Sequence, residues 1–167
     1  MAYRILLVFL PFIIFATAGC GVYSFTGASI EGKTINIRTL DNKARNVVPS
    51  LSPSLTTRIR SRILSQTGLS PVNSDDADYD MSGTITQYNV SVTGVENTQT
   101  ASQNRLTISV QIKFENRLNE KANFTETFTK FADFAANKTL QSEESRLISE
   151  IGEQLANDIF NKAFVNW

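Results

Sequence analysis

The chain has 167 residues, of which 41% are hydrophobic, and its 16 basic side chains are balanced by 16 acidic ones. This composition is typical of one globular domain, and zero net charge without a Lys/Arg run argues against a nucleic-acid-binding protein. The chain has no histidine and one cysteine, which excludes Ser-His-Asp and Cys-His catalytic sites, histidine-rich zinc sites and internal disulfides. We therefore expect a protein that is not an enzyme and holds no metal or cofactor.

The first 19 residues have the pattern of an export signal. Arg4 precedes an apolar run over residues 5–16, and small residues follow it. This run has about 12 residues, whereas a helix needs about 20 to cross a bilayer, so it favours a cleaved signal peptide over a permanent anchor. The segment ending at Cys20 resembles the lipobox of bacterial lipoproteins, which implies cleavage before Cys20 and lipid attachment to this residue. The alternative is an ordinary secretory signal followed by a chance cysteine.

Residues 20–33 are expected to form the lipidated N-terminus and a tether. The segment contains three glycines and shows no hydrophobic period. Gly21 follows the cysteine, and no acidic run is present. Similarity to the sorting signals of lipoproteins then implies neither inner-membrane retention nor surface export. The expected location is the periplasmic face of the outer membrane, with the lipid as anchor.

The first half of the body predicts a strand, a helix and a second strand. Residues 34–40 alternate in the manner of a short half-buried strand. Ser52 followed by Pro53 predicts the start of a helix over about 53–66, with an apolar stripe at every fourth position and Gly68 after its end. Apolar residues alternate again over 81–92, but their phase changes, which indicates a β-bulge near Thr86 or Gln87.

The second half predicts two more strands and a long helix. Residues 105–115 alternate strictly, which requires a sheet with one buried face. Residues 123–134 place Glu126 and Lys130 on the same face as phenylalanines, which predicts a second bulge or an edge strand. Ser142 with two following glutamates predicts the cap of a helix that runs to the chain end.

These elements predict an α+β fold of one domain over residues 34–167. The expected architecture is a two-layer sandwich in which a four-stranded, mostly antiparallel sheet carries two helices on one face, in the order β-α-β-β-β-α. The two central strands are unusually long, and the polar residues 94–104 connect them as a hairpin tip.

Several short motifs together resemble the LptE family of lipopolysaccharide-assembly lipoproteins, in its Bacteroidetes-type branch. They are the lipobox, the Gly-Val-Tyr-Ser-Phe start at residues 21–25, the entry into the second strand over 77–85, and the ending over 158–167. The resemblance spans the mature chain and includes the order of elements. It implies a lipoprotein that plugs the LptD β-barrel of the outer membrane, helps that barrel to assemble, and contacts lipopolysaccharide.

Basic side chains are candidates for contact with lipopolysaccharide, because this ligand carries phosphates. One group lies on the polar face of the strand over 105–115 and just beyond it, and the other flanks the apolar stripe of the first helix: Arg105, Lys113, Arg117, Arg58 and Arg62. The alternative is a solvated surface on which these cations pair with neighbouring Asp or Glu.

Two further regions are candidates for contact with a protein partner. Thr98 and Ser102 lie in the hairpin tip, whose polar side chains can hydrogen-bond to the polar, hydrated inner wall of a barrel. Phe160, Phe164 and Trp167 form a second apolar face on the last helix, which is either a wider core contact or a partner surface. The acidic run over 75–80 lacks the glycine and the final glutamate of a calcium loop, so we expect a solvated turn there.

The sequence therefore predicts a non-enzymatic assembly subunit of the outer membrane. The alternative function is that of an unrelated periplasmic lipoprotein, which serves as a binding module or structural part of another envelope complex.

Overall fold

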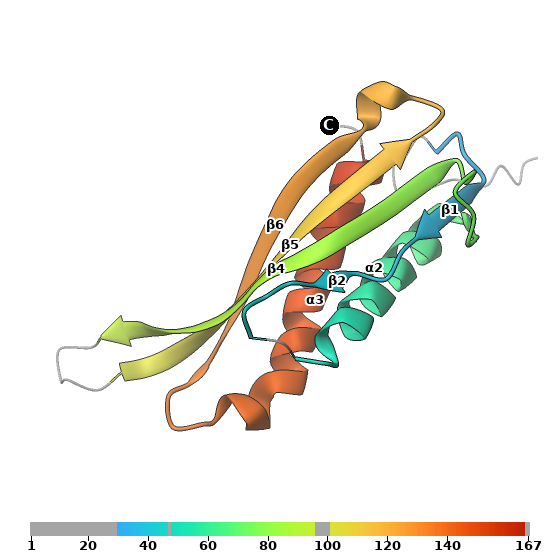
Figure 1. The fold of residues 1–167 in the computed structure, drawn as a ribbon. Helices are drawn as coiled ribbons and strands as arrows, with labels where there is room; N and C mark the ends of the chain where they lie inside the picture. Colours follow the sequence, from blue (N-terminus) through green and yellow to red (C-terminus); the bar gives the residue numbers. More distant parts are fainter. Residues whose placement is uncertain (1–29, 47, 96–100, 166–167) are drawn as a thin grey trace, which may run out of the picture.

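A computed structural model describes residues 30–46, 48–95 and 101–165 of the chain. In this part the chain forms two layers, with a twisted sheet packed against two helices, α2 (Leu51–Thr67) and α3 (Leu140–Phe164) (Figure 1). The α+β class and the two helices are as predicted. Within the described residues, no helix is long and apolar enough to span a membrane.

The sheet differs from the predicted four-stranded, mostly antiparallel one. The described residues form six strands in a mixed sheet, in the order β3-β1-β4-β5-β6, with β2 also paired to β4. The strands β4 (Tyr79–Val95), β5 (Ala101–Asn116) and β6 (Phe124–Ala135) are antiparallel, whereas β1 (Thr34–Ile37) runs parallel to β4. Because α2 connects β1 to β4, the chain returns to the same end of the sheet before β4 begins, which makes the pair parallel.

The two strands that were not predicted are very short. The strands β2 (Asp41–Asn42) and β3 (Ser70–Pro71) have two residues each. The strand β2 pairs in parallel with β4, and β3 pairs in parallel with β1. Two residues are too few to show an alternating pattern, so the sequence carries no periodic signal for them.

The predicted bulge in β4 is confirmed. The register of β4 on β5 shifts between Ile85 and Gln87, so that Ile85 and Tyr88 both face the helices. Beyond this point the β4–β5 ribbon continues past the end of the helical layer (Figure 1). The bulge therefore keeps the apolar side chains of a 17-residue strand on the core side while the ribbon twists.

The strand β6 is the edge strand that the charges in its sequence predicted. Its pairing with β5 shows no register shift, and Glu126 and Lys130 lie opposite the buried residues Ile112 and Ile108. Both charged side chains form ion pairs with α3: Lys130 with Asp158 at 2.6 Å and Glu126 with Lys162 at 2.9 Å. Charges that point inward on an edge strand hinder pairing with another strand.

Both helices begin earlier than predicted. Ser50, not Ser52, is the N-cap of α2, and Ser52 donates a hydrogen bond to the Leu40 carbonyl. Thr139, not Ser142, caps α3, because its hydroxyl accepts a hydrogen bond from the Ser142 amide at 3.3 Å. The end of α2 is as expected, since Gly68 adopts the left-handed conformation with φ of 66°.

The core lies between the sheet and the two helices. The apolar residues of the alternating pattern in β5 are at most 1% exposed, and so are the four predicted stripe residues of α3: Leu106, Ile108, Val110, Ile112, Phe114, Leu147, Ile151, Leu155 and Ile159. This confirms the one-sided sheet. The opposite face of the sheet carries no helix among the described elements and faces outward (Figure 1).

Candidate functional site

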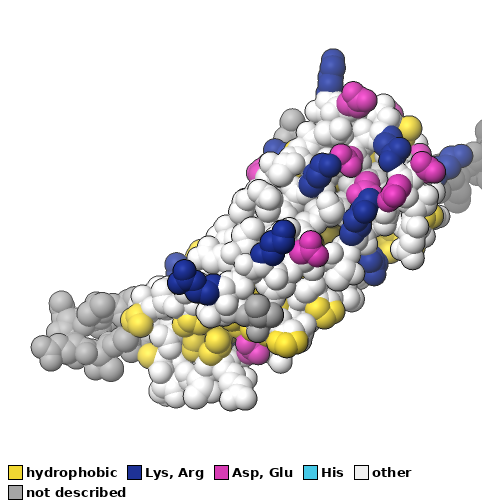
Figure 2. All heavy atoms as spheres, viewed as in Figure 1, with side chains coloured by type: hydrophobic (Ala, Val, Ile, Leu, Met, Phe, Trp, Pro, Cys, Tyr) yellow, Lys and Arg dark blue, Asp and Glu magenta, His cyan; other side chains and the backbone are white. Residues whose placement is uncertain are grey.

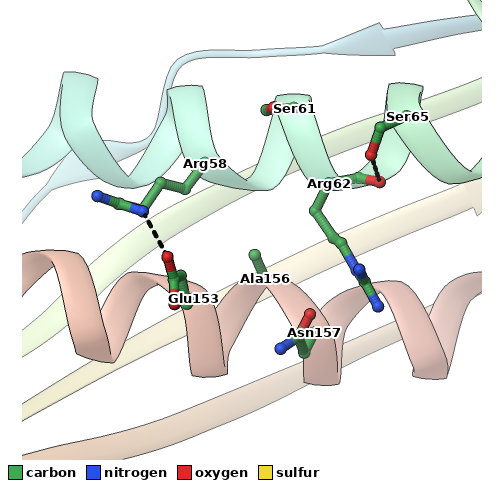
Figure 3. A pocket seen from close by; sticks show the side chains of 7 residues that line it. All are labelled: Arg58, Ser61, Arg62, Ser65, Glu153, Ala156 and Asn157. Atoms are coloured by element: carbon green, nitrogen blue, oxygen red, sulfur yellow. Dashed lines mark hydrogen bonds and ion pairs between the residues drawn. The ribbon is translucent and has the colours of Figure 1, made fainter.

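A groove between α2 and α3 brings together two of the predicted basic residues. Its cavity has a volume of about 360 Å³ and is lined by side chains of both helices: Arg58, Ser61, Arg62, Ser65, Glu153, Ala156 and Asn157 (Figure 3). We call it the α2–α3 groove. It lies on the outer side of the helical layer, because Leu55, Ile59 and Ile63 of α2 are buried in the core.

The groove depends on a close approach of the two helices at Gly152. A methyl group placed on Gly152 would lie 2.7 Å from Cδ of Arg58 and 3.2 Å from Cδ2 of Leu55. The stem of Arg58 therefore occupies the space that a side chain on α3 would otherwise fill. This packing holds the Arg58 guanidinium at one end of the groove.

Arg58 is bound by two groups of α3. Its Nη2 donates to Oγ of Ser149 at 2.5 Å, and its Nη1 lies 3.3 Å from Oε1 of Glu153. Figure 3 shows Glu153 below Arg58 and directed toward it. The carboxylate of Glu153 neutralises the charge of Arg58 locally. Because both side chains are partly exposed, this ion pair contributes little to the stability of the fold.

Arg62 has a different environment. Its guanidinium carbon lies 5.2 Å from the centre of the Phe160 ring, close enough for a cation–π contact. Its Nε is buried and has no hydrogen-bond partner among the described residues. Figure 3 shows the side chain crossing from α2 toward α3, beside Asn157. Arg62 thus brings a positive charge to the groove, while its Nε is buried beneath the surface.

The basic residues predicted on the polar face of β5 are engaged with neighbouring groups. Arg105 forms two hydrogen bonds with Asp133 of β6, at 2.8 and 2.9 Å, and lies 3.7 Å above the Phe131 ring. The hydrogen bond from Arg105 holds the pKa of Asp133 below its usual value, and the pKa of Arg105 is raised by the same bond. For Arg105, the alternative of cross-strand pairing is what the structure shows.

The other two residues of this group are also engaged. Lys113 lies 2.7 Å from Glu115 on the same strand, and Arg117 donates to the backbone carbonyl of Asp75. The structure therefore does not bring Arg105, Lys113 and Arg117 together as one basic site.

Phe160 and Phe164 of α3 belong to the core, so of the two predicted alternatives the structure shows the wider core contact and not the exposed partner surface. Phe160 is 2% exposed and Phe164 5% exposed. Phe164 packs edge-on against the rings of Tyr79 and Phe114, with centroids 5.5 and 5.4 Å apart. The helix has a wide apolar face because it packs across the sheet near its C-terminal end.

The remaining predicted contacts lie beyond what the structure describes. Cys20, Thr98 and Trp167 lie outside the described residues, and of Ser102 only the place in β5 is described. Their proposed roles stay predictions.

The acidic run before β4 has a structural role. Asp78 accepts hydrogen bonds from the backbone amides of Lys33 and Thr34, and Asp80 accepts from Asn36 and Arg38. These contacts join the start of β1 to β4. In the described part of the chain, no group of three or more Asp, Glu, Cys or His side chains is placed to hold a metal ion.

The outward face of the sheet is a broad polar surface. Most of its exposed side chains are hydroxyls and amides, set along three strands: Gln87, Asn89 and Ser91, Gln111, and Thr125, Thr127 and Thr129. Ser109 lies between Gln87 and Thr129: its Oγ donates a hydrogen bond to Oε1 of Gln87 at 3.1 Å and lies 2.8 Å from Oγ1 of Thr129. In the view of Figure 2, basic and acidic side chains are interspersed over the visible face of the molecule, while hydrophobic ones gather mainly along its lower edge.

Sequence reasoning found the two arginines of the α2–α3 groove but missed Ser61, Ser65, Glu153 and Asn157. These four are ordinary polar residues of amphipathic helices. Only the packing of α2 on α3 brings them next to the arginines, and the sequence has no signal for that.

Comparison with known proteins gives a family and a shared fold. Residues 32–163 match the family LptE, described as lipopolysaccharide-assembly. No curated protein matches the chain. A minor lipoprotein from Acinetobacter baumannii is 20% identical with a TM-score of 0.52, and the alignment covers 80% of this chain and 93% of that one.

Two further solved structures agree with this fold. Rare lipoprotein B from Shewanella oneidensis is 16% identical with a TM-score of 0.52, covering 77% of this chain and 92% of that one. The hypothetical protein CT253 from Chlamydia trachomatis is 8% identical with a TM-score of 0.52, covering 81% and 99%.

The family match covers most of the chain, including both helices and the whole of the sheet described above. The chain therefore belongs to the LptE family, which is described as lipopolysaccharide-assembly.

Proposed function

We propose that the protein is a lipoprotein of the outer membrane that plugs an LptD-type β-barrel, assists its assembly, and contacts lipopolysaccharide during transport to the cell surface. Family membership supports a part in lipopolysaccharide assembly. The barrel partner, the plugging and the lipid on Cys20 are the finer steps of this proposal.

The polar outward face of the sheet is the main observation in support of the proposal that the protein plugs a barrel. The interior wall of a large outer-membrane barrel is polar and wet. Hydroxyl and amide side chains such as Thr127, Gln111 and Asn89 can exchange hydrogen bonds with such a wall directly or through water. Because these groups are uncharged, their burial against the wall costs less than the burial of ions. A plug of this kind fits the lumen without strong attraction or repulsion.

The long axis of the molecule also supports insertion. The backbone amide of Gly32 donates to the Tyr79 hydroxyl at 3.1 Å, so the described chain begins beside the start of β4. The strand β4 then runs for 17 residues, about 55 Å at ~3.3 Å per residue, toward the hairpin tip. Gly32 and Val95, the last residue of β4, therefore lie at opposite ends of the sheet. A protein held at the membrane by Cys20 can point the hairpin away from its attachment.

Copurification and crosslinking test the proposal. Full-length protein carrying a photo-crosslinker at Thr98 or Ser102 is expected to capture the barrel in intact cells, as is a crosslinker at Thr127 on the outward face. A crosslinker at Ser145, an exposed residue of α3, is the matched control, and we expect it to give no barrel product.

The outcomes separate the candidate functions. If no LptD-type barrel copurifies from detergent-solubilised outer membrane, and a different envelope complex does, the alternative of another periplasmic role holds. If the barrel is captured from Ser145 but from neither the tip nor Thr127, the protein binds it with the helical layer and the proposed insertion is wrong.

A further inference from the structure

We propose that the outer edge of β4 beyond the bulge accepts an extended segment of the barrel partner as an added strand of the sheet. We call residues 89–93 on this edge the distal edge of β4. The proposal deepens the proposed function, on which it rests for the identity of the partner. It assigns a contact by main-chain pairing, which the side chains of the outward face do not provide.

The backbone of the distal edge is open on one side in the described sheet. The strands β1 and β2 cover β4 only as far as Ile85, and β5 pairs with its other side. The carbonyl of Tyr88 points to the uncovered side, where it accepts a hydrogen bond from Nδ2 of Asn46 at 3.4 Å. Backbone groups alternate between the two sides of a strand, so the N–H and C=O groups of Val90 and Val92 point the same way. Among the described strands, none pairs with them there.

The distal edge lacks the protection that the outer edge of β6 has. The strand β6 carries Glu126 and Lys130 on its core side, and such charges hinder pairing with another strand. Residues 81–95 of β4 contain no charged side chain and no proline. Proteins normally avoid a free edge that is uncharged and rich in β-branched residues, because it pairs readily with another chain. The distal edge therefore has the character of a pairing site.

The side chains of the distal edge define the chemistry of the segment that it accepts. On the core side, Val90 is 38% and Val92 63% exposed, where the ribbon passes the end of the helical layer (Figure 1). On the other side, Asn89 and Ser91 continue the polar outward face. A strand with small apolar side chains on one face and hydroxyls or amides on the other matches both. Its main chain supplies the hydrogen bonds, and its alternate side chains supply the specificity.

Two basic residues lie next to the start of the distal edge. Lys43 and Arg45 are exposed in the loop that follows β2, and the Lys43 amide donates to the Ile85 carbonyl at 3.0 Å. Neither side chain forms an ion pair within the described part of the chain. An acidic residue of the added segment would be attracted to them. We therefore expect a segment that is uncharged along the edge and acidic at the end near Tyr88.

The barrel partner suits this edge better than a second copy of the chain. Two strands of this length bury far less than the ~1,000 Å² of a stable interface, so copies joined only by their distal edges would dissociate. A barrel that is already held by the outward face does not depend on the added strand for its affinity. The strands of a barrel wall are fully paired with one another, so the segment comes from a loop or terminus within the lumen.

Hydrogen exchange of the copurified complex tests the proposal. Full-length protein is compared in detergent with and without its barrel, by mass spectrometry at residue resolution. We expect the amides of Val90 and Val92 to exchange at least about tenfold more slowly in the complex, because each gains a hydrogen bond. The outer amides of β6 are the matched control and should keep their rates. Unchanged exchange at Val90 and Val92 would overturn the proposal, and so would equal slowing at both edges, which indicates general burial.

Two substitutions of Val92 separate main-chain pairing from apolar contact. Val92→Pro removes the outward N–H donor at a position where a sheet edge tolerates proline, whereas Val92→Thr keeps the donor and the β-branched shape. Exchange at Val90 in the complex should return to the barrel-free rate in Val92→Pro and stay within threefold of wild type in Val92→Thr. Equal loss in both variants would show an apolar contact without an added strand. Unfolding curves establish that each variant is folded, and the wild-type comparison stands without them.

The same samples separate this proposal from the proposed function. A barrel that copurifies without slowing exchange at Val90 refutes the added strand and leaves the barrel function intact. Absence of any copurified barrel refutes the barrel function and, with it, the assigned occupant. Sedimentation velocity covers the remaining case: wild-type dimers in which the Val90 and Val92 amides are slowed would assign the edge to a second copy and overturn the proposal.

Discussion

At the scale of single residues, Asp78 joins the first strand to the rest of the sheet. One of its carboxylate oxygens, Oδ2, accepts hydrogen bonds from the Lys33 amide at 2.7 Å, the Thr34 amide at 2.9 Å and the Thr34 hydroxyl at 3.0 Å. The backbone hydrogen bonds from Lys33 and Thr34 are the main reason that the pKa of Asp78 lies below its ordinary value. Three donors on one carboxylate favour the ionised form.

This contact predicts a loss of stability in acid. Because the pKa of Asp78 is lower in the folded state, its contribution is present above the unfolded-state pKa of about 3.9 and is lost as pH falls through the folded value. Asp78→Asn should be less stable than wild type at pH 7 in urea unfolding, and the gap should close at low pH. Asp76→Asn, an exposed neighbour, is the control. A gap of the same size at both pH values would contradict this account.

Gly83 marks a place where β4 has no room for a side chain. A methyl group there would lie 2.7 Å from side-chain atoms of Ile112 and Leu40 and 2.9 Å from the backbone oxygen of Gln111. Backbone cannot yield as a flexible side chain can, so Gly83→Ala should lower the free energy of unfolding by about 1–3 kcal/mol. Chemical denaturation measures this, and a variant as stable as wild type would show that the sheet shifts freely at this point.

Phe160 tests whether the aromatic residues of α3 belong to the core. Its side chain is buried and lies beneath Arg62. Phe160→Ala should therefore lower the free energy of unfolding by about 3–5 kcal/mol, as truncation of a buried aromatic commonly does. An unchanged unfolding curve together with lost capture of a partner would instead support the alternative of a partner surface.

At the scale of elements, β6 shows how charged residues protect an open edge. Its outer edge pairs with no other strand in the described sheet, yet its core side alternates phenylalanine with Glu126 and Lys130. The ion pairs with Asp158 and Lys162 of α3 allow these charges to lie at the border of the core. The same pairs fasten α3 to the edge strand.

Removal of the two inward charges should therefore promote self-association. The double variant Glu126→Val, Lys130→Val makes the edge uniformly apolar on its core side, and we expect dimers or larger species at concentrations where wild type is monomeric. Sedimentation velocity measures this. The variant Glu120→Val, Lys121→Val makes the same changes in the 3-10 turn η2 (Glu120–Ala122) and should stay monomeric. If both variants associate equally, edge protection is not the cause.

At the scale of the whole molecule, Gly32, near the start of the described chain, and Val95, the last residue of β4, lie at opposite ends of a long sheet. Cys20 lies ten positions before the first described residue, Ile30, and a chain of that length in extended form reaches at most about 35 Å. With the lipid that we propose on Cys20, this reach would let the domain rotate near the membrane surface without separating from it. An anchor at that end would leave the other end of the sheet for insertion into another protein.

The proposed lipid on Cys20 is expected to set the location of the protein and not its folding. Cys20→Ala should yield a folded, soluble periplasmic protein or an unprocessed precursor, because the hydrophobic core of the described domain is built from residues between Ile30 and Val165. Cell fractionation and mass spectrometry of the mature N-terminus measure the outcome. A processed variant that stays with membranes in cells lacking the barrel would refute Cys20 as the anchor.

The agreement between the sequence-based predictions and the structure differs from element to element. The alternation in β5, the phase change near Thr86 and the charges of β6 predicted a one-sided strand, a bulge and an edge, and all three are present. These signals are local, since each depends on side chains a few residues apart. The caps at Ser50 and Thr139 were missed because a serine in the first turn of each helix, Ser52 or Ser142, offers a competing cap, and only the backbone path selects one.

The sequence by itself determined the α+β class, the order of the long elements, the core faces of β5 and α3, and the resemblance to a family that the comparison confirms. Tertiary structure alone decided the parallel pairings of β2 and β3, the partners of Arg105 and Arg117, the burial of Phe160, and the meeting of Arg62 with Asn157. Periodicity records which way a side chain points along its own element. It does not record which element lies opposite, because that depends on contacts between residues far apart in the chain, such as Arg58 and Glu153, which are 95 positions apart.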